Sequence, residues 1–390
     1  MTGRPGVAII VNEQTPYRLH LHRRIVNELP EIRLWSLFTH QVASSPWRYQ
    51  EAAEINPVLF GAGESTANQS SLRNSLREYR KGGAIAGWLK EHAIRAVVLF
   101  GYNDLCRLRL VRWCRANQTP CFLFGDSNIL GDNPRGLQAI VKRAYVPWVI
   151  RQCSGVFHCG RLGRDYFLRY GADPSRLYPF PYEPDYNLFS APDPRLAEEM
   201  SAKYELTRGR RRLLFVGRLT RTKRPDLVIE AFDRIADQRP DWDLVVAGDG
   251  DMRAELQQQP AWNNHANRIR WTGFLDDAAK LASLYSICDV FVLPSDYEPW
   301  GVVVTEAATQ LALVASSVVG AAADVLKDGV NGKWFPAGDL GALAHALLEV
   351  TEPQAIDRMK AASPHVLEAW RAQSDPVRHL RQALSDCGVL

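Results

Sequence analysis

The stretch DYEPWGVVVTE, residues 296–306, constrains the fold more than any other part of the sequence. It follows the apolar run DVFVLPS (289–295) and leads into an alanine-rich segment. This pattern predicts a loop between a buried strand and a helix that begins near Val302. In open α/β sheets, ligands bind at loops that follow the carboxyl ends of parallel strands. The sequence therefore predicts an α/β protein with a ligand site at this loop.

The residue types in this loop suggest a ligand that carries both phosphate and hydroxyl groups. Pro299 and Gly301 allow a sharp bend, and backbone N–H groups at a helix start favour an anion. Glu298 and Glu306 would repel phosphate alone, but their carboxylates can accept hydrogen bonds from sugar hydroxyls. The alternative is a glutamate that satisfies the helix dipole, next to an unrelated loop glutamate.

Three further segments have the same strand, glycine and loop pattern: LLFVGRLTRTKRPDL (213–227), LVVAGDG (244–250) and IRWTGF (269–274). In the first of them, Gly217 lets the backbone approach a ligand closely, and Arg218 and Lys223 follow within one loop. A planar guanidinium and a mobile ammonium together suit a diphosphate. The alternative is a solvated basic loop.

Taken in order, GRLTRTK (217–223), EPWGVVVTE (298–306) and DGVNG (328–332) resemble the retaining, nucleotide-sugar-dependent glycosyltransferases of family 4. The resemblance covers residues 213–335 well and the first half of the chain only in outline. That family has the GT-B fold, so the resemblance implies two Rossmann-like domains whose parallel sheets face an interdomain cleft.

The resemblance also implies a role for each matching residue. Arg218 and Lys223 would hold the donor diphosphate and stabilise the charge that develops as it leaves. Glu298 would contact hydroxyls of the transferred sugar, and Glu306 would bind the nucleoside ribose. The remaining donor-side positions contribute mainly backbone: Gly217 near the diphosphate, Gly301, Val302 and Val303 near sugar and phosphate, and Gly248, Gly273 and Phe274 near the base.

The chain length of 390 residues suits two domains. We expect an N-terminal Rossmann-like domain at 1–190 on the acceptor side and a C-terminal one at 191–370 on the donor side. Residues 371–390 are expected to form a helix that crosses back to the first domain, as is common in GT-B proteins. The stretch 44–69 is expected to be a long irregular connection.

The sequence departs from the family pattern in its first loop, where Thr15-Pro16-Tyr17 stands in place of a glycine pair, and in two further places. Near the end of one predicted strand, Phe124-Gly125-Asp126 lacks the histidine that many members have there. Asp126 is therefore the candidate for an acceptor-side contact, and a helix N-cap is its alternative role. After Glu306 the family usually has a glycine and a proline in the turn from helix to strand, whereas this chain has TQLAL (309–313), which is expected to alter the connection behind the site.

Composition excludes several classes of protein. The formal charge of +4 is too small to indicate a nucleic-acid partner, and seven scattered cysteines show no metal-binding spacing. We expect reduced thiols, no signal peptide, no membrane-spanning segment and a cytoplasmic location. Arg218, Lys223 and a helix end can neutralise phosphate, so we expect neither a metal nor another cofactor.

The segment RGLQAIVKRAYVPWVIR (135–151) mixes apolar residues with Lys142, Arg143, Tyr145 and Trp148. Such a mixture is typical of a peripheral contact at the inner face of a membrane. The alternative is an ordinary core helix with a solvated basic face.

We therefore predict a retaining, metal-independent glycosyltransferase that moves a sugar from a nucleotide-diphosphate sugar to an acceptor hydroxyl in cell-surface glycan or glycolipid biosynthesis. The acceptor is a glycan, a glycolipid or a small molecule, and uridine, guanosine and adenosine donors all stay open. Two alternatives belong to other classes: a non-catalytic nucleotide-sugar-binding module, and an epimerase or phosphorylase on the same fold.

Overall fold

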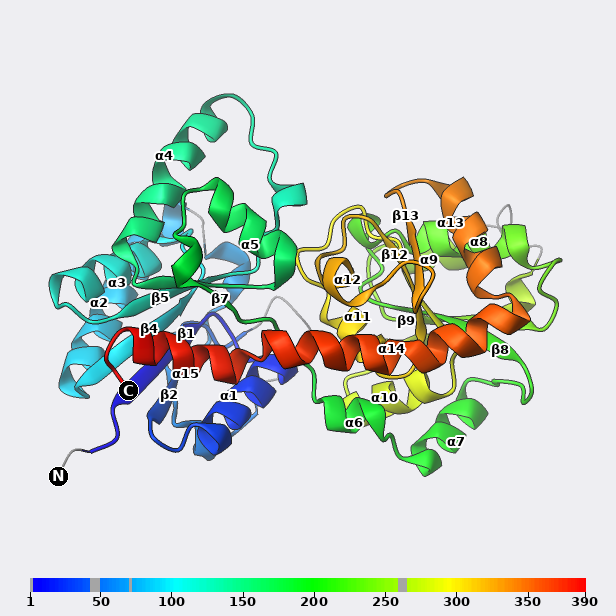
Figure 1. Ribbon diagram of the computed structural model, residues 1–390, viewed down its shortest axis with the longest axis horizontal. Helices are drawn as coiled ribbons and strands as arrows, with labels where there is room; N and C mark the ends of the chain where they lie inside the picture. Colours follow the sequence, from blue (N-terminus) through cyan, green and yellow to red (C-terminus); the bar gives the residue numbers. More distant parts are fainter. Residues whose placement is uncertain (1–2, 43–49, 70–71, 259–264) are drawn as a thin grey trace. The chain divides into compact units, whose positions relative to one another are not determined.

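The computed structural model describes residues 3–42, 50–69, 72–258 and 265–390. The chain divides into two compact units. Unit 1 comprises residues 1–183 and 374–390, and unit 2 comprises residues 184–373. The C-terminal segment that begins at Ser374 thus packs with the N-terminal unit (Figure 1).

Unit 1 is built on a seven-stranded parallel sheet with the order β3-β2-β1-β4-β5-β6-β7. Its strand β1 lies between β2 and β4, has the sequence GVAIIV and is buried on both faces, which explains its continuous apolar run. Its register pairs Gly6 with Arg33 and Val11 with Phe38 of the next strand. The strands are β1 (Gly6–Val11), β2 (Arg33–Phe38), β3 (Pro57–Leu59), β4 (Ile94–Phe100), β5 (Cys121–Gly125), β6 (Gly155–His158) and β7 (Leu177–Pro179).

Helices cover this sheet, and each strand-to-helix connection follows the carboxyl end of a strand (Figure 1). The helices are α1 (Pro16–Glu28), α2 (Ser75–Glu91), α3 (Leu105–Ala116), α4 (Gly136–Gln152), α5 (Gly160–Arg169) and α15 (Pro376–Asp386). One core cluster packs Ile85 and Leu89 of α2 and Leu110 of α3 against Val97 and Leu99 of β4. A second cluster packs α4 and α5 against β5 and β6.

Unit 2 has a six-stranded parallel sheet with the order β10-β9-β8-β11-β12-β13. Its strands are β8 (Arg211–Val216), β9 (Trp242–Ala247), β10 (Ile269–Gly273), β11 (Val290–Leu293), β12 (Ala312–Ser316) and β13 (Gly332–Phe335). Its helices are α6 (Tyr186–Ser190), α7 (Pro194–Lys203), α8 (Pro225–Ile235), α9 (Arg253–Gln258), α10 (Ala278–Ser286), α11 (Val302–Ala307), α12 (Gly320–Val325), α13 (Leu340–Val350) and α14 (Pro353–Ser374).

Each sheet has one point at which the strand order reverses direction. In unit 1 it lies between β1 and β4, and in unit 2 it lies between β8 and β11. Adjacent connections diverge there to opposite faces of the sheet, so a crevice opens at the carboxyl ends of the two strands. In unit 2 the two loops at this point are those that follow Val216 and Leu293, which contain the GRLTRTK and DYEPWG motifs.

The α/β prediction is confirmed, because both sheets are parallel and carry Rossmann-like strand–helix repeats. The helix predicted near Val302 begins at that residue. Within the stretch expected to be irregular, the structure places the short edge strand β3. Residues 43–49 of that stretch lie outside the described residues.

Candidate active site

Two loops that are 70 residues apart in sequence meet at the strand reversal of unit 2. The backbone N–H of Asp296 donates a hydrogen bond to the carbonyl of Thr222, at 2.9 Å. Next to this bond, the Lys223 ammonium forms an ion pair with Oε2 of Glu298. The structure therefore brings together two residues that the sequence assigns to diphosphate and to sugar.

Lys223 is largely buried, with 19% of its side chain exposed, whereas Arg218 is exposed at the start of the same loop. Burial of the ammonium, and then the positive charge of Arg218, lower the pKa of Lys223 to about 8. The ion pair with Glu298 acts in the opposite direction. Arg218 adds an exposed cation to the loop that holds this ion pair, so the loop can offer positive charge to a negatively charged ligand.

The loop that carries Glu298 is fixed by its neighbour, the start of α12. The Glu298 carbonyl accepts from the Gly320 N–H at 3.0 Å, and the Trp300 carbonyl accepts from the Ala321 N–H at 2.7 Å. The chains approach so closely that a Cβ atom on Gly320 would lie 2.1 Å from the Pro299 carbonyl oxygen. Only glycine therefore fits at position 320.

Helix α11 starts after Gly301, whose φ of 87° lies in the left-handed region that glycine adopts most easily. Val302 and Val303 form its first turn, as predicted. However, α11 has only six residues, so its macrodipole is weak. Positive charge in this part of unit 2 therefore comes from side chains of the 217–224 loop, among them Arg218 and Lys223.

Glu306 lies on the inner side of α11 and is 9% exposed. The Tyr285 hydroxyl, on α10, donates a hydrogen bond to its Oε2 at 3.1 Å. Burial raises the pKa of Glu306 to about 7, and the bond from Tyr285 opposes this rise. Tyr285 was missed from the sequence, because a tyrosine in an amphipathic helix has the pattern of a core residue.

The unusual residues after Glu306 have specific partners. The Thr309 hydroxyl donates to the Glu306 carbonyl at 2.6 Å, and the Gln310 side-chain amide donates to the Phe189 carbonyl. These two side chains tie the end of α11 to α6, so the connection is held although the usual glycine and proline are missing.

Three glycines lie side by side at the carboxyl ends of β8, β9 and β10. The N–H of Gly217 donates to Ala247, and the N–H of Gly248 donates to the Gly273 carbonyl at 2.9 Å. A Cβ atom on Gly248 would lie 1.8 Å from the Gly217 carbonyl oxygen. Phe274, which follows directly, is 38% exposed. The predicted base-binding positions thus form one neighbourhood with an accessible aromatic ring.

Asp126 lies in unit 1, directly after β5, and is exposed. Its carboxylate accepts a hydrogen bond from Tyr182 and lies near Arg18. The alternative role as an N-cap is wrong, because Asn128 caps the following turn by accepting from the N–H of Leu130 at 3.0 Å. Asp126 therefore stays a candidate for contact with an acceptor.

In unit 1, a buried arginine bonds to groups at the carboxyl ends of three strands, β1, β2 and β4. Arg107 of α3 is fully buried, with its guanidinium paired to Asp104 at 3.3 Å and hydrogen-bonded to Asn12 and Thr39. This buried position of Arg107 could not be predicted from the sequence, because LCRLRLVRW resembles a helix with a solvated basic face.

Two groups among the described residues have metal-ligand geometry, and both lie in unit 1: His40, Glu64 and Glu78, and Glu78, Asp104 and Cys106. In the first group the Lys81 ammonium bonds to Glu64 at 2.7 Å and to Glu78 at 2.9 Å. Lysine thus supplies the positive charge there. Neither group includes a predicted donor-site residue.

The two Rossmann-like units define a protein of the GT-B class, and comparison with solved structures agrees. Sucrose-phosphate synthase from Thermosynechococcus elongatus matches with a TM-score of 0.75 and 18% identity, over 98% of this chain and 100% of that one. HepE of Anabaena, in complex with UDP and glucose, matches with a TM-score of 0.71 and 16% identity, over 99% and 100%.

Sequence comparison finds similarity to glycosyltransferases over part of the chain. Residues 197–363 match the family described as "Glycosyl transferases group 1". An uncharacterized glycosyltransferase of Methanocaldococcus jannaschii is 38% identical over 122 residues, which are 31% of each chain. The alpha-D-kanosaminyltransferase of Streptomyces kanamyceticus is 26% identical over 60% of this chain and 62% of its own.

The family match, residues 197–363, falls within unit 2. The chain spans 31% and 36% of the length of the first curated relatives that it matches. These similarities and the GT-B fold agree with the resemblance carried by the GRLTRTK and EPWGVVVTE motifs.

Proposed function

We propose that this protein is a retaining glycosyltransferase of family 4 that transfers a sugar from a nucleotide-diphosphate sugar to an acceptor hydroxyl. The observation that carries this proposal is the ion pair between Lys223 and Glu298, with Arg218 in the same loop, at the strand reversal of unit 2. The ion pair joins an ammonium, which can bind an anion, to a carboxylate, which can bind hydroxyls. A nucleotide sugar carries both the phosphate and the hydroxyls that these two groups would bind.

In this proposal, Arg218 and Lys223 bind the diphosphate of the donor. The bond between the anomeric carbon and the phosphate oxygen breaks, and its electron pair stays on the leaving nucleoside diphosphate. The acceptor oxygen forms the new bond to the anomeric carbon, and its proton passes to the leaving diphosphate oxygen. The two cations stabilise the negative charge that grows on the diphosphate during this step.

Glu298 and Glu306 have different parts in donor recognition. Glu298 accepts hydrogen bonds from hydroxyls of the transferred sugar once Lys223 has turned to the phosphate. Glu306 accepts hydrogen bonds from the ribose, for which its ionised form is the better acceptor. Gly301, Val302 and Val303 contribute backbone N–H groups near the sugar and phosphate.

The donor nucleotide is proposed to be uridine diphosphate, because the similar structure of HepE contains UDP and glucose. The base would lie at Gly248, Gly273 and Phe274. Asp126 is proposed to contact the acceptor. No metal is assigned to the reaction. The protein is proposed to lie in the cytoplasm, with peripheral contact at the inner face of a membrane.

A thermal-shift screen with UDP, GDP and ADP, followed by calorimetry with the nucleotide that stabilises most, tests donor binding. Transfer is then measured as release of the nucleoside diphosphate, with and without a pool of glycan, glycolipid and small-molecule acceptors. We expect binding of one nucleotide and acceptor-dependent release. Absence of binding by all three nucleotides would overturn the proposal.

The same assay separates the alternative functions. Tight binding without turnover against any acceptor pool would indicate a nucleotide-sugar-binding module. Conversion of the donor without a separate acceptor would indicate an epimerase, and dependence on inorganic phosphate would indicate a phosphorylase. Retention is checked by NMR of the product anomer.

A further inference from the structure

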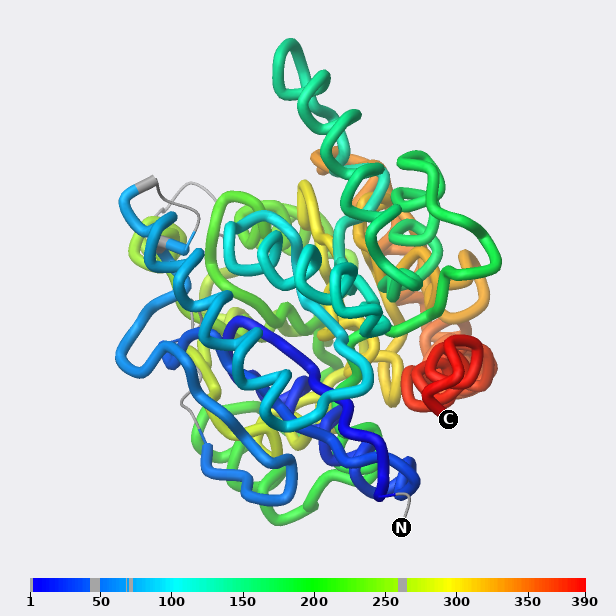
Figure 2. The backbone as a smooth tube through the Cα atoms, turned by 90° about the vertical axis from the view of Figure 1, so that its left-hand side faces the viewer, coloured from blue at the N-terminus to red at the C-terminus, as the bar shows by residue number. Residues whose placement is uncertain are grey.

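Helix α14 turns one stripe of buried side chains toward the rest of unit 2. The helix runs across this unit (Figure 1), and Figure 2 views it nearly end-on. Neither α14 nor any other described helix is long and apolar enough to cross a membrane. Its buried residues are Ile356, Met359, Ser363 and Leu367, at the spacing of a single helix face. Trp370 follows Leu367 by three residues and therefore continues this stripe into the last turns of the helix.

Trp370 packs against the loop that carries Glu298. Its indole lies 5.7 Å from that of Trp300, measured between ring centroids, and the two ring planes are inclined at 33°. Trp300 is only 2% exposed, although it lies in a loop. Aromatic rings at this separation attract each other beyond the effect of the area that they bury. Trp370 therefore helps to fix the position of the Trp300 side chain.

The residues on both sides of Trp300 belong to the proposed donor site. Glu298 precedes it by two residues, and Gly301 follows it as the residue before α11. A Cβ atom on Gly301 would lie 2.9 Å from Cγ of Glu298, so the Glu298 side chain folds back over this short turn. Because the turn is so tightly packed, a shift of Trp300 would displace the Glu298 carboxylate relative to the Lys223 ammonium.

The loop is thus held from two sides, by α12 and by α14. The N–H groups of Gly320 and Ala321 bond to its backbone, whereas Trp370 contacts a side chain. The next residue of α14, Arg371, is itself anchored: its guanidinium carbon lies 3.8 Å from the centre of the Tyr186 ring on α6. This cation–π contact holds the end of α14, and with it Trp370, in place.

We propose that Trp370 is a positioning residue of the transferase. Through Trp300 it holds the Glu298 carboxylate against Lys223 in the free protein, and on hydroxyls of the transferred sugar during transfer. The second role rests on the proposed function, whereas the first can be measured in the free protein. Loss of Trp370 should therefore reproduce the loss of the Glu298 carboxylate, although Trp370 acts only through another side chain.

Pulse labelling of lysines tests the role in the free protein without any donor. After a short pulse of acetic anhydride at pH 7, mass spectrometry gives the rate of acetylation of Lys223 relative to that of exposed Lys203. Trp370→Ala should raise this relative rate about threefold or more, because an ammonium without its carboxylate partner loses its proton more readily. Glu298→Gln gives the reference increase. Trp370→Phe, which keeps an aromatic ring beside Trp300, should stay close to the parent.

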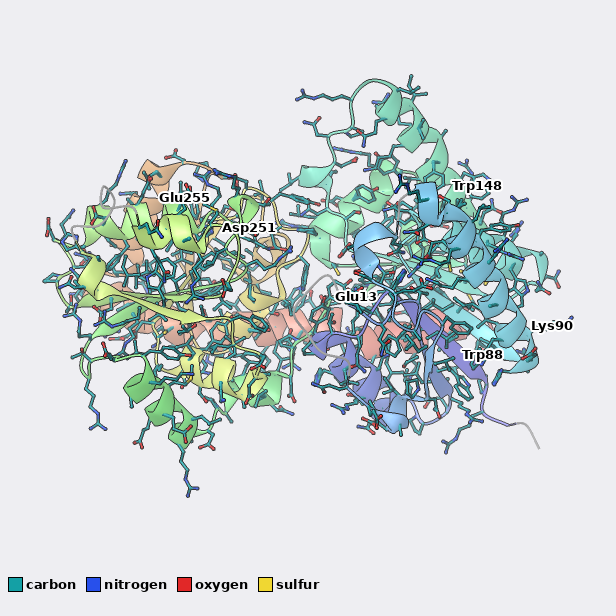
Figure 3. All side chains as sticks on the ribbon, turned by 180° about the vertical axis from the view of Figure 1, so that it is seen from behind. Glu13, Trp88, Lys90, Trp148, Asp251 and Glu255 are labelled. Carbon is teal, nitrogen blue, oxygen red and sulfur yellow. The ribbon has the colours of Figure 1, made fainter. Side chains whose placement is uncertain are left out.

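Trp88→Ala is the matched control. Trp88 of α2, labelled in Figure 3, is half-buried like Trp370 and forms a tryptophan pair with Trp35 of unit 1, at 5.1 Å between ring centroids. Its loss removes a contact of the same kind from the other unit. It should lower Tm and leave the labelling of Lys223 unchanged. An equal rise in this control would reduce the effect of Trp370→Ala to general destabilisation and would overturn the inference.

The transfer assay tests the second role. Trp370→Ala should lower kcat at least about tenfold, while UDP binds at least as tightly as to the parent, because Lys223 has lost its competing partner. A residue that only stabilised the fold would weaken UDP binding and transfer together, so that result would contradict the positioning role. Trp370→Leu, which fills part of the space, replaces Trp370→Ala in all measurements if the latter does not fold.

The two assays distinguish a failure of this inference from a failure of the proposed function. An unchanged rate of Lys223 labelling in folded Trp370→Ala would overturn the link between Trp370 and Glu298, whatever the donor. A raised rate in a protein that binds no nucleotide would support this link and would refute the transferase proposal instead.

Discussion

Lys223 and Glu298 neutralise each other across the two loops at the strand reversal of unit 2. In the proposed reaction, Lys223 binds the diphosphate and Glu298 binds the transferred sugar. The ion pair therefore holds both side chains in place before the donor binds, and donor binding has to exchange it for two new interactions.

Replacing Glu298 with glutamine should affect nucleotide binding and transfer in opposite directions. Lys223 loses its competing partner, so UDP should bind about three- to tenfold more tightly by calorimetry. The transfer rate should fall at least tenfold, because an amide orients the sugar hydroxyls less well than a carboxylate. An unchanged Kd for UDP would show that the ion pair does not compete with the diphosphate.

Lys223→Ala and Arg218→Ala should each lower kcat/KM by roughly ten- to a hundredfold or more, since a charged hydrogen bond contributes about 1.5–3 kcal/mol. A fall in kcat would place the cations on the leaving group, and a rise in KM alone would limit them to donor binding. Arg221→Ala is the matched control, because its side chain is 83% exposed on the same loop. Kinetics near those of the parent in both variants would refute the assignment of the site.

The affinity for nucleotide should depend on pH through Glu306. Its pKa of about 7 leaves it largely protonated at pH 6 and ionised at pH 8. If only the carboxylate binds ribose, affinity should rise roughly tenfold over that range. Glu306→Gln should lack this part of the pH profile, whereas the titration of the nucleotide itself affects both proteins equally. Identical profiles would contradict the role of Glu306.

Glu306 should also make the stability of the protein decrease with rising pH. Its pKa in the folded protein lies above the ordinary value of 4.5. The free energy of unfolding therefore falls as pH rises from about 4.5 to 7, where the folded state retains the proton longer than the unfolded state does. Glu306→Gln should lose this decline, which a comparison of Tm at pH 5 and pH 8 would detect.

Activity should not change when EDTA is added, because Arg218 and Lys223 supply the positive charge for the diphosphate. The measurement is nucleoside diphosphate release after dialysis against EDTA, with Mg²⁺ and Mn²⁺ restored separately as controls. Loss of activity with EDTA and recovery with either ion would assign a metal to the reaction.

Gly320→Ala should destabilise unit 2 by more than about 2 kcal/mol, since the new methyl group would collide with the Pro299 carbonyl oxygen. The shift in Tm should be accompanied by loss of UDP binding, because the collision displaces the loop of Glu298. Gly87→Ala is the matched control: it lies in α2 with no atom within 4 Å of the added Cβ, so stability should be equal or slightly higher.

The apolar runs of this sequence were sufficient to predict buried parallel strands, because only a strand covered on both faces is apolar throughout, as in GVAIIV. Glycine and basic residues after such runs predicted the loops at β8 and β11, since the backbone geometry that glycine permits is a local property. Local signals of this kind do not identify a three-residue edge strand, so β3 was missed.

Only the tertiary structure decided how the predicted residues are paired. That Lys223 meets Glu298 follows from the placement of β11 beside β8 in the sheet. That Glu306 is buried against Tyr285 depends on the packing of α10, and that Leu137 and Ile140 are exposed depends on where α4 leaves the unit. Periodicity along a chain determines which residues share a face, but contacts between segments distant in sequence determine whether that face meets protein or solvent.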